Sequence, residues 1–191
     1  GALYAQVRNG APFQVFLSAD DRTPKRMQDE GLGVAGSRFT YATGKLVLWS
    51  RQPGLVDNRG EVLRTSAFQR IAVANPRLAP YGAAAIEVMT RMGVLADVQA
   101  RIVQGDNIAQ TYQFIATENA QLGFVALSQV TVDGKIAQGS AWIVPGDLHA
   151  PIRQDALLLT AGKDNAAAVA LLRFLKEETA RAVILSYGYA L

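Results

Sequence analysis

The chain has 191 residues, of which half are hydrophobic and 18% are charged, a composition that supports a globular core in one or two domains. Its formal net charge is only +3 and its basic residues are scattered, so no arginine–lysine run indicates binding to nucleic acid or to a membrane surface. The sequence contains no cysteine, which excludes disulfides and thiolate chemistry, and no apolar run reaches the ~18 residues of a membrane-spanning helix.

Short apolar runs alternate with longer amphipathic patterns from one end of the chain to the other. The apolar runs predict strands at residues 13–18, 38–50, 71–74, 122–127, 141–144 and 156–160. The amphipathic patterns predict helices near residues 2–9, 24–30, 81–92, 107–119, 164–176 and 178–187. Strands followed by helices are typical of βαβ units, so we expect an α/β fold with mostly parallel sheets flanked by helices.

Two strand-like stretches, residues 38–50 and 152–160, are well placed to cross between two lobes. If both cross, residues 45–150 form one lobe, and residues 1–44 together with 151–191 form the other. The second of these lobes is then discontinuous in sequence, and the crossing stretches are the expected hinge.

Two segments, residues 78–82 and 105–110, lie where an apolar strand is expected to lead into a helix. Pro80 fits a helix start, and Gly82 permits a close approach of the backbone. Asn107 is a good N-cap, with Gln110 three residues later as its capping-box partner. First-turn N–H groups and the helix dipole attract anions, so two converging starts would form an anion trap; the local pattern alone favours two ordinary helix starts.

Other motifs favour structural roles over chemistry. Residues 31–36 match the G-x-G-x-x-G spacing, but they follow a polar helix and precede a strand, which indicates a helix end and a loop. His149, the only histidine, lies in a Pro/Gly-containing loop and is interpreted as a surface residue. Gly188 is expected to end the last helix, and Asp20–Asp21 to cap the helix before Pro24. Because no nucleophile, base and oxyanion hole come together, we expect a protein that is not an enzyme.

Several motifs resemble those of the periplasmic molybdate-binding proteins of ABC transporters. The most specific are the segment GAPFQVFLSAD at residues 10–20 and the stretch from residue 36 to residue 50. Further matches fall in the family's order and spacing at residues 75–76, 79–82, 101–103 and 122–127. The resemblance covers essentially the whole chain and implies a type II periplasmic-binding fold, with two α/β lobes and a hinge.

The resemblance also implies how an oxyanion would be held. The main-chain N–H groups of Tyr81 and Ile108 match the family's second-lobe donors, with Asn107 and Gly82 as secondary candidates. The remaining ligands, which the family takes from its first lobe, are expected upstream of Gly1, so the chain is expected to lack the first strand, helix and strand of that lobe. Some family members add a tyrosine hydroxyl where this chain has Ala126.

The function that the resemblance implies is capture of molybdate, or of tungstate of nearly equal size, and delivery to an ABC transporter permease. No cofactor, no direct protein–metal bond, no nucleic acid and no membrane insertion are expected, and the protein is expected to be a periplasmic monomer. Two alternatives remain: a ligand-sensing regulatory domain of the same fold, and an α/β hydrolase or transferase.

Overall fold

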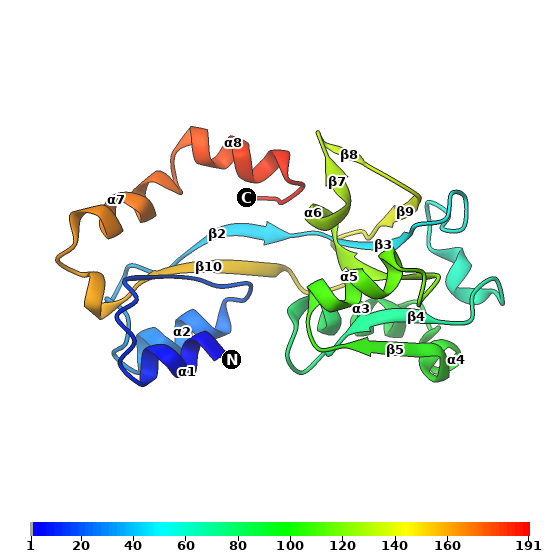
Figure 1. The fold of residues 1–191 in the computed structure, drawn as a ribbon, viewed down its shortest axis with the longest axis horizontal. Coiled ribbons are helices and arrows are strands. Elements are labelled where there is room, and N and C mark those ends of the chain that lie inside the picture. Colours follow the sequence, from blue (N-terminus) through cyan, green and yellow to red (C-terminus); the bar gives the residue numbers. More distant parts are fainter. Residues whose placement is uncertain (1) are drawn as a thin grey trace. The chain divides into compact units, whose positions relative to one another are not determined.

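The computed structural model describes residues 2–191 and divides the chain into two compact units (Figure 1). The central unit comprises Gly44–Ile152. The terminal unit comprises the residues up to Thr43 together with Arg153–Leu191. The chain therefore passes from one unit to the other twice, between Thr43 and Gly44 and between Ile152 and Arg153.

The central unit is built on a five-stranded sheet in the order β5-β4-β6-β3-β9. The strands are β3 (Leu46–Ser50), β4 (Ile71–Ala74), β5 (Ile102–Gly105), β6 (Leu122–Ala126) and β9 (Ser140–Ile143). β4 pairs in parallel with β5 and β6, whereas β3 is antiparallel to both β6 and β9. The sheet is therefore mixed rather than mostly parallel, because β3 enters it against the direction of the βαβ strands.

Helices cover both faces of this sheet. The helical segments of the central unit are η1 (Glu61–Arg64), α3 (Pro80–Arg91), α4 (Leu95–Val98), η2 (Gln99–Arg101), α5 (Ile108–Ala116) and α6 (Leu127–Val130). A hairpin of β7 (Thr131–Val132) and β8 (Lys135–Ile136) follows α6. Leu46 and Leu48 of β3 pack on the α3 side with Val88, whereas Val47 and Trp49 pack on the α5 side. Both faces of β3 are buried because side chains alternate along a strand and each face has its own helix layer.

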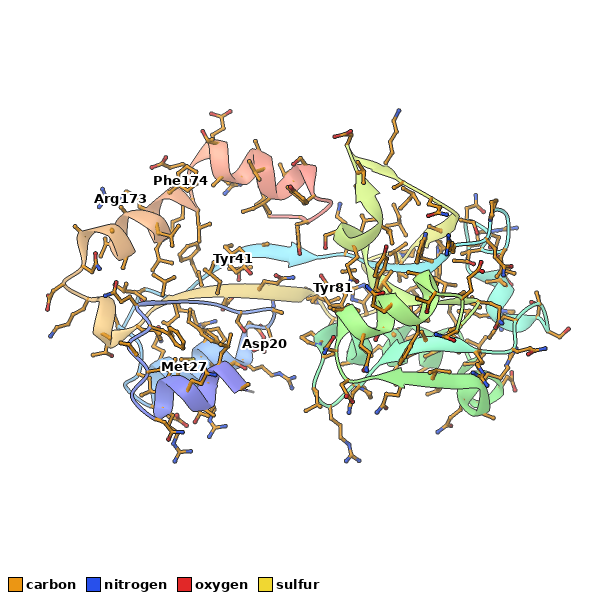
Figure 2. All side chains as sticks on the ribbon, viewed as in Figure 1. Asp20, Met27, Tyr41, Tyr81, Arg173 and Phe174 are labelled. Carbon is orange, nitrogen blue, oxygen red and sulfur yellow. The ribbon has the colours of Figure 1, made fainter. Side chains whose placement is uncertain are left out.

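The terminal unit holds a three-stranded sheet in the order β1-β10-β2. Its elements are α1 (Ala2–Arg8), β1 (Val15–Leu17), α2 (Arg22–Asp29), β2 (Phe39–Gly44), β10 (Ile152–Leu158), η3 (Thr160–Gly162), α7 (Ala166–Phe174) and α8 (Glu178–Ser186). α1 and α2 cover one face, where Met27 packs with Phe16 and Leu157, and α7 covers the other, where Leu172 packs with Leu158 (Figures 1 and 2).

Some element boundaries differ from those predicted. Residues 38–50 form two strands, β2 and β3, with Lys45 between them, because β2 pairs with β10 and β3 pairs with β6 and β9. β5 was not among the predicted strands. β10 runs from Ile152 to Leu158, whereas the predicted strand spans residues 156–160.

The predictions for individual motifs had different outcomes. Residues 31–36 form a loop after α2 with Gly31 and Gly36 at positive φ, and Gly188 adopts φ 83°, as expected. The prediction that His149 is a surface residue is wrong, since the side chain is only 7% exposed and its Nδ1 lies 2.7 Å from the Ala150 carbonyl oxygen.

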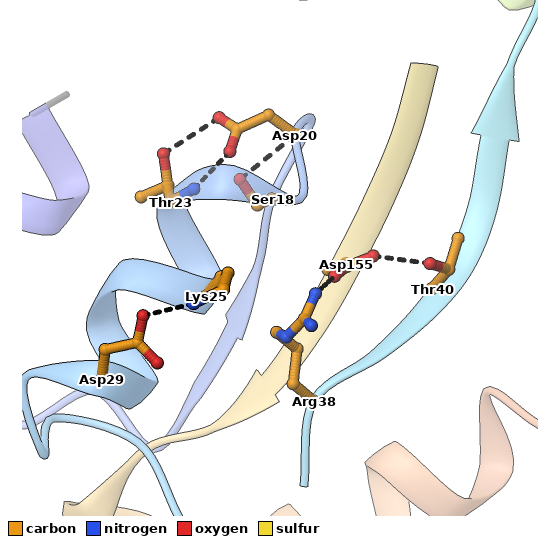
Figure 3. A network of polar contacts seen from close by, with 8 residues as sticks. All are labelled: Ser18, Asp20, Thr23, Lys25, Asp29, Arg38, Thr40 and Asp155. Carbon is orange, nitrogen blue, oxygen red and sulfur yellow. Dashed lines mark hydrogen bonds and ion pairs between the residues drawn. The ribbon is translucent and has the colours of Figure 1, made fainter. Parts of the chain in front are cut away.

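A buried carboxylate on β10 is hydrogen-bonded to Arg38 and Thr40, at the start of β2 (Figure 3). Asp155 of β10 is 1% exposed and accepts hydrogen bonds from the Arg38 guanidinium and, at 2.7 Å, from the Thr40 hydroxyl. Its main-chain carbonyl accepts from the Ser18 N–H at 2.9 Å, immediately after β1. One residue therefore ties β10 to the segments of both neighbouring strands.

We expect Asp155→Ala to lower the free energy of unfolding by about 2–3 kcal/mol, because two hydrogen bonds to a buried charge are lost. The matched control is Lys25→Ala, which breaks the exposed Lys25–Asp29 ion pair in the same unit and should change stability by less than about 0.5 kcal/mol. Urea unfolding followed by circular dichroism measures both, and equal effects would show that the Asp155 network does not stabilise the sheet.

Tyr41 gives the terminal unit a distinct alkaline response. Burial, helped by the charges of Tyr189 and Asp155, raises the pKa of Tyr41 to about 12, and its hydroxyl lies 3.2 Å from the Ser18 carbonyl oxygen and from Gln154 Oε1. The folded state therefore retains a proton that the unfolded state loses near pH 10, so this contribution to stability is complete below pH 10 and declines as the pH rises toward 12. Between pH 9 and pH 12, the midpoint temperature of thermal unfolding should fall more steeply for the natural chain than for Tyr41→Phe. Parallel curves of midpoint against pH would refute the assignment.

Candidate oxyanion site

The carboxyl ends of β4 and β5 lie side by side at one edge of the central sheet. The two strands are parallel, with Ala74 opposite Gly105, and α3 and α5 follow them along the chain. The Asn75 N–H donates a 2.7 Å hydrogen bond to the Gly105 carbonyl, which extends the pairing one residue beyond β4. Ligands of open α/β sheets bind at such carboxyl edges, so the two predicted helix starts meet where a site is expected.

A compact turn built on Asn75 leads into α3. Its carbonyl accepts hydrogen bonds from Leu78 N–H at 3.1 Å and Ala79 N–H at 2.8 Å, and its Oδ1 accepts from Arg77 N–H at 3.0 Å. Ala79 is extended (φ −124°, ψ 122°) and acts as the N-cap, with Pro80 as the first helical residue. The start of α3 is therefore fixed by short-range hydrogen bonds before Tyr81 is reached.

Tyr81 is the second residue of α3 and its side chain is buried in the core of the central unit (Figure 2). Gly44 makes room for it, because a Cβ at Gly44 would overlap the Tyr81 hydroxyl oxygen. The aromatic ring thus anchors the first turn of α3, and the Tyr81 main-chain N–H is one of the N–H groups of that turn.

Gly82 lets α3 approach β4 closely. A Cβ at this position would overlap the Ala74 carbonyl oxygen, so only glycine fits. Its N–H donates to the Ala79 carbonyl at 3.0 Å. The close approach predicted for Gly82 is therefore present, and it is made with the strand beneath the helix.

Asn107 is the N-cap of α5, as predicted. Its backbone is extended (φ −150°, ψ 173°) and its Oδ1 accepts the Gln110 N–H at 2.9 Å. The return contact differs from the predicted capping box, since Gln110 Oε1 accepts the Asp106 N–H at 2.6 Å and not that of Asn107. Within residues 2–191 the structure gives the Ile108 N–H, in the first turn of α5, no acceptor.

A third strand end lies next to these two. β6 is parallel to β4 and ends at Ala126, where α6 begins. Gln129 of α6 accepts the Ala126 N–H through Oε1 at 3.0 Å and donates from Nε2 to the Ile108 carbonyl at 3.2 Å. Sequence reasoning did not select Gln129 or Asn75, although an amide three residues after a strand end and an Asn-Pro pair after an apolar run are recognisable cap and turn signals.

Few charges lie at these chain segments. Residues 75–82 contribute only Arg77 and residues 105–110 only Asp106, and both are exposed. No group of three or more His, Asp or Glu residues suited to hold a metal ion occurs in the described part of the chain. The site can therefore attract an anion mainly through N–H groups and the positive ends of two helix dipoles. The first-lobe ligands expected upstream of Gly1 lie outside the described residues.

Residues 1–190 match the family described as bacterial extracellular solute-binding protein. The chain belongs to this family. It is 58% identical over 191 residues to the molybdate-binding protein ModA of Azotobacter vinelandii, which covers all of this chain and 76% of that protein. It is 53% identical over 189 residues to the ModA of Rhodobacter capsulatus, covering 99% of this chain and 73% of that protein.

Solved structures agree with this assignment. The periplasmic molybdate-binding protein of Azotobacter vinelandii superposes with a TM-score of 0.93 at 43% identity, over 100% of this chain and 84% of that one. The substrate-binding domain of a molybdenum ABC transporter protein from Clostridium difficile gives 0.77 at 25% identity, over 99% and 81%. The solute-binding protein thus has the type II periplasmic-binding fold. Among residues 2–191, no helix is long and apolar enough to cross a membrane.

The tight packing at the start of α3 can be tested by adding one methyl group. We expect Gly82→Ala to destabilise the protein by about 1–3 kcal/mol, because the new Cβ displaces α3 from the Ala74 carbonyl. Gly146→Ala is the control, since a Cβ there meets nothing within 4 Å, and it should change stability by less than about 0.5 kcal/mol. Urea unfolding compares the two variants; an unaffected Gly82→Ala would show that α3 can shift without cost.

Proposed function

We propose that this solute-binding protein captures molybdate at the carboxyl edge of the central sheet and delivers it to the permease of an ABC transporter. The observation that carries the proposal is the pair of helix starts, at Tyr81 and Ile108, held next to each other by the parallel pairing of β4 and β5. The molybdate-binding names of relatives at 58% and 53% identity support the choice of ligand.

The donor chemistry suits a fully deprotonated oxyanion. Such a dianion only accepts hydrogen bonds, and the proposed main-chain groups only donate them. Each hydrogen bond to a charged partner contributes about 1.5–3 kcal/mol, so a few well-placed N–H groups give strong binding without a lysine or arginine in contact. Asn107 and Gly82 would support the site as the N-cap of α5 and the close-packing residue of α3. Tungstate, of nearly equal size and equal charge, should bind at the same place.

The protein is proposed to bind and release its ligand unchanged, as a periplasmic monomer that needs no cofactor. The relatives reported above are named as binding proteins, which favours this function over a hydrolase or a transferase. The three strand ends of the central unit carry main-chain N–H groups, which suit the binding of an anion.

Isothermal titration with sodium molybdate tests the proposal on the full-length protein. Ile108→Pro removes the donor while Asn107, already extended, accommodates the proline, so affinity should fall by about tenfold or more. Ile108→Ala is the matched control, since it loses the same side chain but keeps the N–H, and Tyr81→Phe likewise keeps its N–H. Both should stay within about threefold of the natural protein.

Two outcomes would contradict the proposal. If sodium molybdate releases no heat and leaves the thermal midpoint of the natural protein unchanged, molybdate is not its ligand. If Ile108→Ala loses as much affinity as Ile108→Pro, the side chain rather than the main-chain N–H makes the contact. Titration with sodium sulfate, a smaller dianion, shows how far size contributes to selection.

A further inference from the structure

Two consecutive peptide units in the first turn of α5 are each fixed by a side chain. The Asn107 carbonyl accepts the Thr111 hydroxyl at 2.9 Å in addition to the Thr111 N–H at 3.1 Å. The Ile108 carbonyl accepts Gln129 Nε2 at 3.2 Å, from a helix 21 positions later in the chain. Most first-turn carbonyls in a helix have no such second donor, so these contacts set the orientation of both peptides more firmly than helix hydrogen bonds alone.

The carbonyl contacts also determine where the opposite ends of these peptides point. In a trans peptide the N–H lies on the side opposite to the C=O. The Asn107 carbonyl therefore sets the direction of the Ile108 N–H, and the Ile108 carbonyl sets the direction of the Ala109 N–H. A hydrogen bond accepted at the carbonyl also polarises the peptide and strengthens the donor at its other end.

The neighbouring N–H groups are already used within the protein. Gln110 N–H donates to Asn107 Oδ1, Asp106 N–H donates to Gln110 Oε1, and Ala126 N–H donates to Gln129 Oε1. In the described part of the chain, neither the Ile108 N–H nor the Ala109 N–H has an acceptor, and Ala109 is exposed. Three amide side chains thus occupy the competing donors and leave two adjacent ones.

We infer that the Ala109 N–H is a second oxyanion donor at α5 and that Gln129 is the residue that positions it. The inference rests on the proposed function, because it concerns the same oxyanion. Gln129 acts through the Ile108–Ala109 peptide and does not touch the ligand. A glutamine can make both contacts, because its Oε1 accepts the Ala126 N–H and its Nε2 donates to the Ile108 carbonyl.

Nuclear magnetic resonance of the ¹⁵N-labelled full-length protein is the direct test. On addition of sodium molybdate, the amide protons of both Ile108 and Ala109 should move downfield in the natural protein. In Gln129→Met, which fills similar space without polar atoms, the shift of the Ala109 proton should be largely lost while that of the Ile108 proton remains. Affinity by calorimetry should fall by about fivefold.

Gln129→Glu separates positioning from a merely structural role. Glutamate keeps the acceptor for Ala126 but loses the donor to Ile108, and it places a negative charge beside the anion. Positioning through Ile108 therefore predicts that Gln129→Glu, like Gln129→Met, loses most of the molybdate-induced shift of the Ala109 proton. A role limited to capping α6 predicts that Gln129→Glu keeps this shift, because the acceptor for the Ala126 N–H is still present. Thermal unfolding without ligand checks that both variants fold.

Each result decides a different question. No spectral change anywhere in the natural protein would overturn the proposed function itself. A shifted Ile108 proton with an unmoved Ala109 proton in the natural protein would leave that function intact and overturn the inference, as would an unchanged Ala109 shift in Gln129→Glu. If Gln129→Met does not fold, the natural protein and Gln129→Glu still give these results.

Discussion

Four register pairs hold β4 beside β5 in parallel, and the hydrogen bond from Asn75 to Gly105 carries that pairing past the strand ends. The positions of α3 and α5 depend on it, because each helix begins within a few residues of its strand. The bond also fixes the spacing between two sets of first-turn amides. A slip of one residue between these strands would change the distance between the two helix starts.

At the proposed site, the central unit would offer a dianion fixed dipoles in place of formal charges. Helix termini attract anions without the long, flexible side chains whose ordering would oppose binding. The side chains of Asn75, Asn107, Gln110 and Gln129 accept hydrogen bonds from main-chain donors around the site. Their combined effect is to hold the loops rigid before any ligand arrives, which reduces the cost of ordering on binding.

Part of this arrangement could be predicted from local sequence. The apolar run of β4, the proline that opens α3 and the asparagine that caps α5 each act over a few residues, and all three predictions are confirmed. β5 was missed because its apolar run is only Ile102 and Val103, followed by Gln104 and Gly105. The burial of His149 and the contact of Gln129 with Ile108 depend on segments far apart in the chain, so no local pattern reveals them.

Reliance on main-chain donors has a consequence for how such proteins diverge. At position 108 the ligand would accept a hydrogen bond from a main-chain N–H, which every amino acid except proline carries. Many residues could therefore replace Ile108 without loss of this contact. Selection would act instead on Asn107, Thr111 and Gln129, whose side chains hold the peptides in place. A ligand assigned to one family member is therefore transferred to a distant member more safely when the residues at positions 107, 111 and 129 are compared. The residues whose N–H groups contact the ligand carry less information.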